Sequence, residues 1–435
     1  MTSTPQRRPA RHSPERRPAQ QPLVSRTVEV QDPGPLLSML PPVHDPADLC
    51  AWVRRGEGMV GWGRALSFHS SGAARFEQAQ RWWRDTADHA VVRDEVQLPG
   101  TGPVAFGSLS FAGDSASGAT LVVPEVVVGR RGDRWWVTTT GAGSQLPAAL
   151  RPVPTPPAQR PESVSFAEGP LSGQQWTRSV ADAVDRIGAG ELEKVVLARS
   201  VQASARAPID PRWVLTQLAA RYDNTWVFAA DALVGATPEM LVRLEKGLVT
   251  SRVLAGTIQR TGDDARDLAL AASLARSSKD LEEHEYAVRS VAQALAPHCS
   301  SVNVPESPFV LHLPNVMHLA TDVAGVLADS TTSLGLAASL HPSAAVCGTP
   351  TDRASAVIAE LERMDRGRYA GPVGWMDAAG DGDWGIALRC GAFDRADASR
   401  LRLFAGCGIV AGSDPAMELA ESEAKLIPMK QALTG

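Results

Sequence analysis

Short apolar or alternating runs, each ended by glycine, proline or aspartate, follow one another through residues 57–140. They include M-V-G-W-G-R-A-L-S-F, G-P-V-A-F-G-S-L-S-F, A-T-L-V-V-P-E-V-V-V-G and R-W-W-V-T-T-T. Runs of this length and composition are typical of β-strands. A helix is predicted among them near residues 74–89. This part of the chain therefore builds mainly sheet.

The pattern changes after the proline-rich stretch 151–162, which reads as a linker or surface crossing. Beyond it, amphipathic segments alternate with short apolar ones. Helices are predicted at 176–187, 211–222, 265–296 and 415–432, and strands at 195–201, 225–229, 240–245 and 248–253. Because both element types occur in quantity, neither a helical bundle nor a pure β fold fits, and a mixed α/β (α+β) fold is expected.

We divide the chain into three parts. Residues 1–30 are rich in arginine and proline and lack the hydrophobic core of a secretory signal, so they are predicted to be a disordered basic tail. A basic arm that contacts an acidic partner is the alternative interpretation. Residues 31–162 form the N-terminal strand-rich part, and residues 163–435 carry the candidate catalytic segments.

Composition narrows the possible partners. The 435 residues carry a formal net charge of −5, which gives no general attraction to nucleic acid or to an anionic membrane. No apolar run approaches the roughly 18 residues of a membrane span. The five cysteines are scattered without a C-x-x-C pair, which fits reduced thiols in the cytoplasm rather than a zinc site or disulfide framework. We expect a cytoplasmic protein that binds neither membrane nor nucleic acid.

A lysine and a glutamate are candidates for acid/base chemistry. Lys194 directly precedes the apolar run Val195–Leu197, and Glu239 follows a proline in A-T-P-E-M-L. Each is unspecific alone, and Lys194 also fits a surface lysine at a strand end. A lysine at the mouth of a strand can lose its proton through desolvation or a nearby cation and then act as a base. Glu239 could supply the matching acid.

Carboxylates on two predicted helices suggest a metal site. Glu283 lies in S-S-K-D-L-E-E-H, and Glu421 shares one face of the last helix with Glu418 and Lys425. Each group alone also fits a solvated acidic face or an ordinary ion pair. Magnesium prefers oxygen ligands and takes only one or two protein carboxylates. One glutamate from each helix, Glu283 and Glu421, would be enough to hold Mg²⁺.

The segment L-R-L-F-A-G-C-G-I-V-A, residues 401–411, resembles part of a dinucleotide fingerprint. A dinucleotide fold needs a second strand ending in an acid about 20 residues later, and here one helix follows before the chain ends. Gly406 and Gly408 are better suited to bringing backbone N–H groups close to an anion such as a carboxylate. Arg389, in the predicted strand W-G-I-A-L-R-C, would add a bidentate donor.

Taken together and in this order, the segments resemble the chorismate-utilising enzymes, and among these the isochorismate synthases, over roughly residues 57–430. The matching stretches are E-K-V-V-L-A-R (193–199), T-P-E (237–239), L-A-G-T (254–257), S-S-K-D-L-E-E-H (277–284), H-P-S-A-A-V-C-G-T-P (341–350), Y-A-G-P-V-G-W (369–375), L-R-C (388–390), G-C-G-I-V (406–410) and E-L-A-E-S-E-A-K (418–425).

The resemblance implies a four-layer α/β/β/α architecture of two similar αβ halves with the active site between them. It also implies a magnesium-dependent, reversible reaction in which water attacks C2 of chorismate and the C4 hydroxyl leaves, giving isochorismate. Lys194 would be the base that activates water, and Glu239 the acid that protonates the leaving hydroxyl. The two environments should then favour opposite protonation states.

The resemblance also assigns binding roles. Mg²⁺ on Glu283 and Glu421 would fix the ring carboxylate, and the enolpyruvyl carboxylate would be held separately. His341 either lines the ring pocket or is a structural histidine. The residues assigned to the ring-carboxylate end are Gly256, Thr257 and Lys425, and those assigned to the enolpyruvyl carboxylate are Tyr369, Arg389, Gly406 and Gly408.

A few positions select among family members. Lys194 and Ala255 count against the ammonia-adding members, so we expect no glutamine amidotransferase subunit. We also expect a monomer. The segment 341–348 favours isochorismate synthase over salicylate synthase, which also eliminates pyruvate and is the enzymatic alternative. A catalytically silent relative is the alternative from another class. Leu281 and Arg368 depart from the family pattern. The menaquinone, siderophore and salicylate pathways stay open as destinations of the product.

Overall fold

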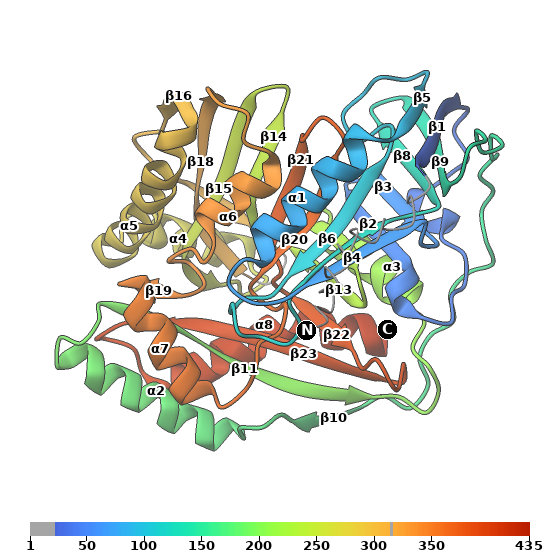
Figure 1. The fold of residues 1–435 in the computed structure, drawn as a ribbon. Helices are drawn as coiled ribbons and strands as arrows, with labels where there is room; N and C mark the ends of the chain where they lie inside the picture. Colours follow the sequence, from blue (N-terminus) through green and yellow to red (C-terminus); the bar gives the residue numbers. More distant parts are fainter. Residues whose placement is uncertain (1–21, 314–315) are drawn as a thin grey trace, which may run out of the picture.

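The computed structural model describes residues 22–313 and 316–435, except for the side chains of Lys279 and Glu283. Two large sheets pack face to face, and helices cover the outer face of each (Figure 1). The order of layers is helix, sheet, sheet, helix. The predicted mixed α/β fold with four layers is confirmed.

The first sheet has 13 strands and contains most of the segments around the candidate site. Its order is β10 (Ser165–Glu168), β11 (Lys194–Ser204), β23 (Arg400–Ile409), β22 (Cys390–Phe393), β13 (Leu233–Thr237), β12 (Trp226–Ala230), β2 (Leu49–Arg54), β3 (Glu57–Trp62), β8 (Val126–Arg131), β9 (Arg134–Ala142), β1 (Leu23–Val30) and β5 (Val91–Asp94), with β19 (Gly348–Thr349) paired to β11. All these pairs are antiparallel except β1 with β5.

The second sheet has 10 strands. Its order is β16 (Cys299–Asn303), β18 (Val316–Leu327), β15 (Leu248–Gln259), β14 (Met240–Glu245), β21 (Gly382–Ile386), β20 (Pro372–Asp377), β6 (Val104–Leu109), β7 (Ala119–Val123) and β4 (Leu66–Ser70), with β17 (Phe309–His312) paired to β18. Strands β2 and β6 of the N-terminal part pair with β12 and β20 of the C-terminal part. Residues 31–162 therefore extend both sheets.

Helices α2 (Gly173–Gly188), α3 (Pro211–Arg221), α7 (Thr351–Glu362) and α8 (Pro415–Thr434) pack on the first sheet. Helices α1 (Arg75–Asp88), α4 (Asp264–Leu274), α5 (Ser278–Leu295) and α6 (Ser333–Leu340) pack on the second. Short 3₁₀ turns occur at η1 (Leu36–Met39), η2 (Pro46–Asp48) and η3 (Ala296–His298). No helix in the described part of the chain is both long and apolar enough to cross a membrane.

Two of the sequence predictions need correction. The predicted tail included residues 23–30, but these form β1 and pair with β9 along its full length. Thr27 bonds Thr138 across the strands at 2.8 Å. The run L-V-S-R-T-V-E-V carries four apolar residues, a strand signal that the prediction of a tail overlooked. Residues 1–21 of the predicted tail lie outside the described residues. The helical tract predicted over 265–296 consists of two helices, α4 and α5, since Ser277 accepts a hydrogen bond from the Asp280 N–H and starts α5.

The buried residues form two main clusters. The larger lies between the sheets and includes the fully buried Phe106, Phe228 and Trp384. The smaller lies between the first sheet and helices α3 and α8, where Leu218 and Leu426 are fully buried. Strands β11 and β23, together with α8, are thus held from both sides, and a rigid framework positions the side chains that project from their ends.

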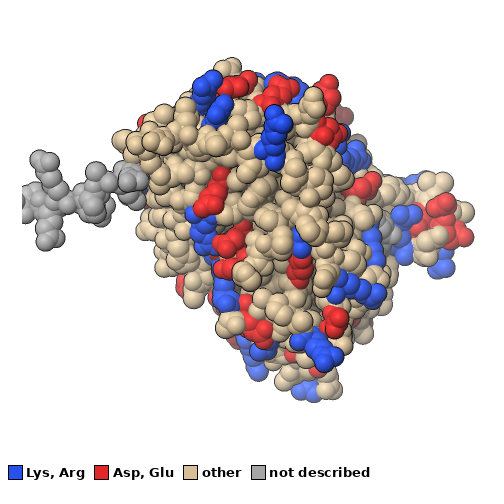
Figure 2. Space-filling view, turned by 90° about the vertical axis from the view of Figure 1, so that its right-hand side faces the viewer, with Lys and Arg blue, Asp and Glu red and all other residues tan. Residues whose placement is uncertain are grey.

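Charged side chains of both signs are interspersed on the face shown in Figure 2, without a large patch of one sign. This agrees with the small net charge of −5. An anionic substrate must therefore be met by a local arrangement of cations rather than by the general field of the protein.

Candidate active site

A cavity of about 210 Å³ lies where β11 and β23 approach the β14–β15 end of the second sheet and helix α8. Its lining includes ten of the twelve residues predicted from the sequence. These are Lys194, Glu239, Gly256, Thr257, Tyr369, Arg389, Gly406, Gly408, Glu421 and Lys425. Residues more than 200 positions apart in the chain thus meet in one cavity. We call it the central cavity.

Lys194 enters the central cavity from a strand of the first sheet, and Glu239 enters it from the connection between the two sheets. Lys194 is the first residue of β11, in register with Thr349 of β19. Glu239 lies between β13 and β14, where its backbone N–H donates to Thr237 Oγ1 at 3.2 Å and its carbonyl accepts from the Ile386 N–H at 3.2 Å. These bonds fix the backbone from which the carboxyl projects.

Burial decides the protonation state of Glu239. The residue is 6% exposed, and this burial raises the pKa of its carboxyl from 4.5 to about 8. The charges of Arg389 and Lys425, and that of Lys194 when it is protonated, oppose the rise without cancelling it. Glu239 is therefore mainly protonated at neutral pH and can donate a proton to a group in the cavity.

Helix α8 presents one acidic and one basic side chain, Glu421 and Lys425, to the central cavity. Lys425 Nζ donates to Glu421 Oε1 at 2.6 Å and to the Gly406 carbonyl at 3.0 Å. Burial disfavours charge on Lys425, but Cys407 and Glu421 outweigh it and the pKa of Lys425 is raised. Burial also acts against ionised Glu421, yet Lys425 and Arg389 lower the pKa of this carboxyl. Both groups are charged at neutral pH.

Oxygen donors for a metal gather at the same place. Ligand atoms of Glu418, Glu421 and Cys407 lie within 4.8 Å of one another, and Asp280 of α5 also lines the cavity. The Cys407 thiol donates to the Glu418 carbonyl at 3.3 Å, which leaves the carboxylates as the hard ligands. Carboxylate oxygens of this kind suit a hard divalent cation. Glu283 lies on α5, but its side chain is outside the described residues.

Tyr369 and Arg389 form another part of the wall. Tyr369 is 4% exposed and stacks on Phe404 with ring centroids 5.1 Å apart and an interplanar angle of 9°. A Cβ at Gly406 would lie 3.1 Å from the Tyr369 Oη, which is tighter than most Cβ contacts and would displace the tyrosine hydroxyl slightly. Arg389 adopts φ = 47°, and burial lowers the pKa of its guanidinium. Arg389 and Tyr369 offer donors suited to a carboxylate.

The β15 bulge shapes the opposite wall. Pairing of β15 with β18 shifts between Ala255 and Thr257, and the intervening Gly256 has φ = 75°. Thr257 Oγ1 lies 3.0 Å from His318 Nδ1, and burial lowers the pKa of His318 to about 3. His318 is therefore neutral, and its Nε2 has no hydrogen-bond partner within the described residues.

The sequence patterns did not predict His318 as a site residue. They did not predict Asp280 either, although Asp280 lies within the motif S-S-K-D-L-E-E-H. His318 interrupts the apolar run V-M-H-L-A of β18, and an ionisable residue inside such a run is a signal that could have been used. Asp280 approaches Gly256 closely, since a Cβ at 256 would lie 3.2 Å from the Asp280 Cβ. Nothing in the local sequence reveals that proximity.

His341 lies elsewhere. Its Nε2 is 2.9 Å from the Phe111 carbonyl oxygen, and its ring contacts Phe76 and Phe111. These residues line a different cavity beside α1 and α7. His341 therefore has the surroundings of a structural histidine, which was one of its two interpretations. In the described structure this residue does not line the central cavity.

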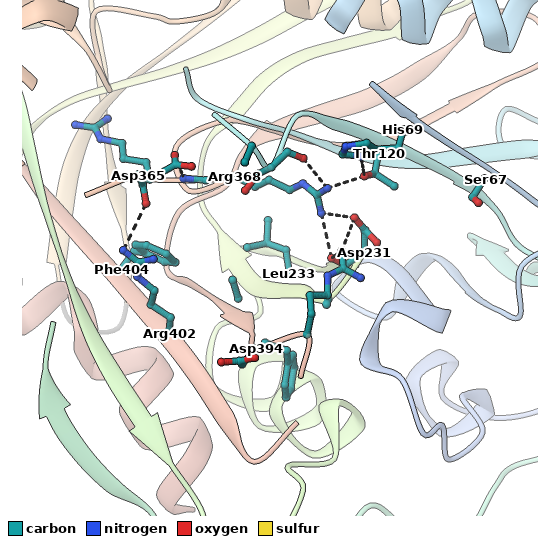
Figure 3. Close-up of a pocket in the computed structure, with 18 of the residues that line it drawn as sticks. Ser67, His69, Thr120, Asp231, Leu233, Asp365, Arg368, Asp394, Arg402 and Phe404 are labelled. Carbon is teal, nitrogen blue, oxygen red and sulfur yellow. Dashed lines mark hydrogen bonds and ion pairs between the residues drawn. The ribbon is translucent and has the colours of Figure 1, made fainter. Parts of the chain in front are cut away.

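A second cavity, of about 730 Å³, is lined in part by Phe404 (Figure 3). Arg368 points into it, pairs with Asp231 and donates to Thr120 Oγ1 at 2.6 Å. Burial acts against ionised Asp231, but Arg368 and Arg395 lower the pKa of this carboxyl to about 2. The departure from the family pattern at Arg368 is thus accommodated by an ion pair outside the central cavity.

Comparison with known proteins agrees with this geometry. The family model described as "Chorismate binding enzyme" matches residues 10–434. The chain belongs to the chorismate-binding enzymes. Relatives in this family include isochorismate synthase DhbC of Bacillus subtilis, which is 37% identical over 79% of this chain and 84% of its own length. The salicylate biosynthesis isochorismate synthase of Pseudomonas aeruginosa is 34% identical, over 88% of this chain and 84% of its own.

Solved structures of chorismate-binding enzymes share the fold. The menaquinone-specific isochorismate synthase MenF of Escherichia coli superposes with a TM-score of 0.78, covering 97% of this chain and 96% of that one at 24% identity. Anthranilate synthase component I of Streptococcus pneumoniae superposes with a TM-score of 0.69, covering 87% and 92% at 21% identity. The four-layer arrangement is thus common to family members with different names.

Proposed function

We propose that this chain is an isochorismate synthase that converts chorismate reversibly to isochorismate. The observation that carries the proposal is the buried, protonated Glu239 in the same cavity as Lys194, with the cations Arg389 and Lys425 beside them. A proton donor, a candidate base and two carboxylate anchors are the groups this hydroxyl shift needs. The relatives named isochorismate synthase support the same choice.

In the proposed reaction, Lys194 as neutral amine removes a proton from water while the water oxygen bonds to C2 of the ring. The ring double bonds shift, the C4–O bond breaks, and Glu239 delivers its proton to the departing oxygen, which leaves as water. The lysine ends protonated and the glutamate ionised, and proton exchange with solvent restores both. In the reverse direction the same two groups exchange roles.

Two anchors would hold the substrate dianion. Tyr369 and Arg389, with the amides around Gly406 and Gly408, would bind the enolpyruvyl carboxylate. Gly256, Thr257 and Lys425 would surround the ring carboxylate. Glu421, with Glu283 as predicted from sequence, would hold Mg²⁺, and Glu418 and Asp280 are further oxygen donors nearby. The bound ion would supply counter-charge to the ring carboxylate.

The proposal is tested by product analysis on purified protein with chorismate and magnesium. Chromatography should yield a mixture of chorismate and isochorismate, reached from either side, without ammonium or glutamine. A coupled lactate dehydrogenase assay should register no pyruvate. Pyruvate released at the rate of chorismate consumption would instead indicate salicylate synthase, and no turnover at all would indicate a silent relative.

The acid and base assignments have their own test. Lys194→Ala should lower turnover by roughly 10²- to 10⁴-fold, the range that a positioned proton transfer supplies, with little change in chorismate affinity. Circular dichroism would confirm that the variant folds. Near-normal turnover would remove Lys194 from the role of base.

A further inference from the structure

A pocket of about 390 Å³ opens between the two sheets at the end away from the central cavity. It is bounded by the last residues of β2, β8 and β14 and the first residues of β3 and β12. Strand β14 starts next to Glu239 and ends at Glu245, so six residues of extended chain separate the two sites by about 20 Å. We call this space the tryptophan–arginine pocket.

Four tryptophans form its aromatic walls: Trp52, Trp136, Trp226 and Trp375. All are buried, and Trp52 and Trp226 lie nearly parallel with ring centroids 6.4 Å apart. The Trp52 indole donates to Asp383 at 2.9 Å. The indole N–H groups of Trp136 and Trp375 have no acceptor within the described residues, which is uncommon for buried donors.

The pocket also carries excess positive charge. Five arginines and three carboxylates line it, so two positive charges remain uncompensated. Arg131 pairs with Glu245 at 2.6 Å, and Arg243 pairs with Asp383 at 2.6 Å. These pairs use two of the three carboxylates.

Arg54 is one of three arginines lining the pocket, with Arg55 and Arg130, that have no counter-ion within the described residues. It forms no ion pair within the described residues, its Nε has no hydrogen-bond partner, and its guanidinium lies 4.3 Å from the centroid of the Trp226 ring. Burial, followed by repulsion from Arg252 and Arg55, lowers the pKa of Arg54 to about 10. A partly buried guanidinium held over an aromatic face and short of an anion is a recognition element for a carboxylate.

We propose that the tryptophan–arginine pocket binds a small planar aromatic carboxylate. Its ring would contact the indole walls, and its carboxylate would pair with the Arg54 guanidinium. The volume falls in the range of small-molecule sites, which combine apolar walls with a few fixed polar groups. This site is separate from the central cavity and does not depend on the proposed reaction.

Calorimetric titration of the full-length protein tests the proposal, with benzoate as the probe. Benzamide, which has the same shape without the charge, and cyclohexanecarboxylate, which has the charge without the planar ring, serve as matched ligands. Benzoate should bind at least tenfold more tightly than either. Arg54→Gln should weaken benzoate binding at least tenfold, whereas the exposed neighbour Arg55→Gln should change it less than threefold.

A control variant separates this site from the central cavity. Arg389→Gln should leave benzoate binding through Arg54 unchanged. Loss of binding in Arg389→Gln with none in Arg54→Gln would place benzoate in the central cavity and overturn the proposal. Equal affinity for benzoate and benzamide would overturn it as well.

Crystals soaked in 4-bromobenzoate give a test that does not depend on any variant folding. The anomalous signal of bromine should lie within the tryptophan–arginine pocket, beside Trp226. Bromine found only in the central cavity, or at no site, would refute the proposal.

Discussion

Replacing Glu239 by glutamine should make the protein more stable and nearly inactive. The buried carboxyl has its pKa raised from 4.5 to about 8, so the folded state binds a proton more tightly than the unfolded chain does. The free energy of unfolding therefore falls as pH rises from about 4.5 to about 8. Above the folded-state pKa of about 8, the stabilisation that the bound proton provides is lost. Glutamine has the same shape and never ionises, so its variant escapes this loss.

The size of the effect follows from the shift. In the unfolded chain the pKa of this carboxyl lies about 2.5 units below pH 7. Each unit costs the parent protein about 1.36 kcal/mol of stability, because the folded state keeps the proton that the unfolded state releases. Glu239→Gln should therefore be about 3 kcal/mol more stable than the parent protein at pH 7. The gain should be near zero at pH 4.5 and approach about 5 kcal/mol above pH 8. The mutated group is also the proposed acid, so turnover should fall roughly 10²- to 10⁴-fold.

Chemical denaturation from pH 5 to pH 8.5, combined with product chromatography, measures both effects. Glu245→Gln, at the other end of β14, is the matched control. Its carboxylate is half-buried and paired with Arg131, so its loss should cost at most about 1 kcal/mol and leave turnover intact. A stability difference for Glu239→Gln that stays constant with pH would refute the assigned pKa. Normal turnover would refute its role as acid.

Two further predictions concern the metal and the Tyr369 wall. Excess chelator should abolish activity, and added magnesium should restore it. Glu421→Gln should need at least tenfold more magnesium for half-maximal activity. Glu423→Gln should not, because Glu423 pairs with Lys430 outside the cavity. Full activity in chelator would contradict the metal site. Gly406→Ala should raise KM for chorismate about tenfold by displacing Tyr369, a loss of about 1.4 kcal/mol of binding, whereas Gly412→Ala, in open space, should leave KM unchanged. An unchanged KM in Gly406→Ala would remove Tyr369 from the proposed anchor.

The sequence alone determined the mixed fold and most of the cavity. The sequence predicted α1, α2, α3 and α8 almost to their ends. For α1 and α2 the reason is the 3.6-residue period, because these helices bury one face and expose the other. Ordered motifs supplied Lys194, Glu239, Arg389 and Lys425, all of which line the central cavity. Such features are local, since they depend on residue type and on spacing within a single element.

Only the tertiary structure decided which separate segments meet. Strand β1 pairs with β9, more than 100 residues away, and its Ser25 and Thr27 bond threonines of that strand, a partnership that local sequence does not specify. His318 and Asp280 reach the cavity because the β15 bulge and the start of α5 converge on it. The raised pKa of Glu239 likewise comes from burial by several distant elements. Register, burial and electrostatic environment arise from long-range packing, and local sequence specifies them weakly.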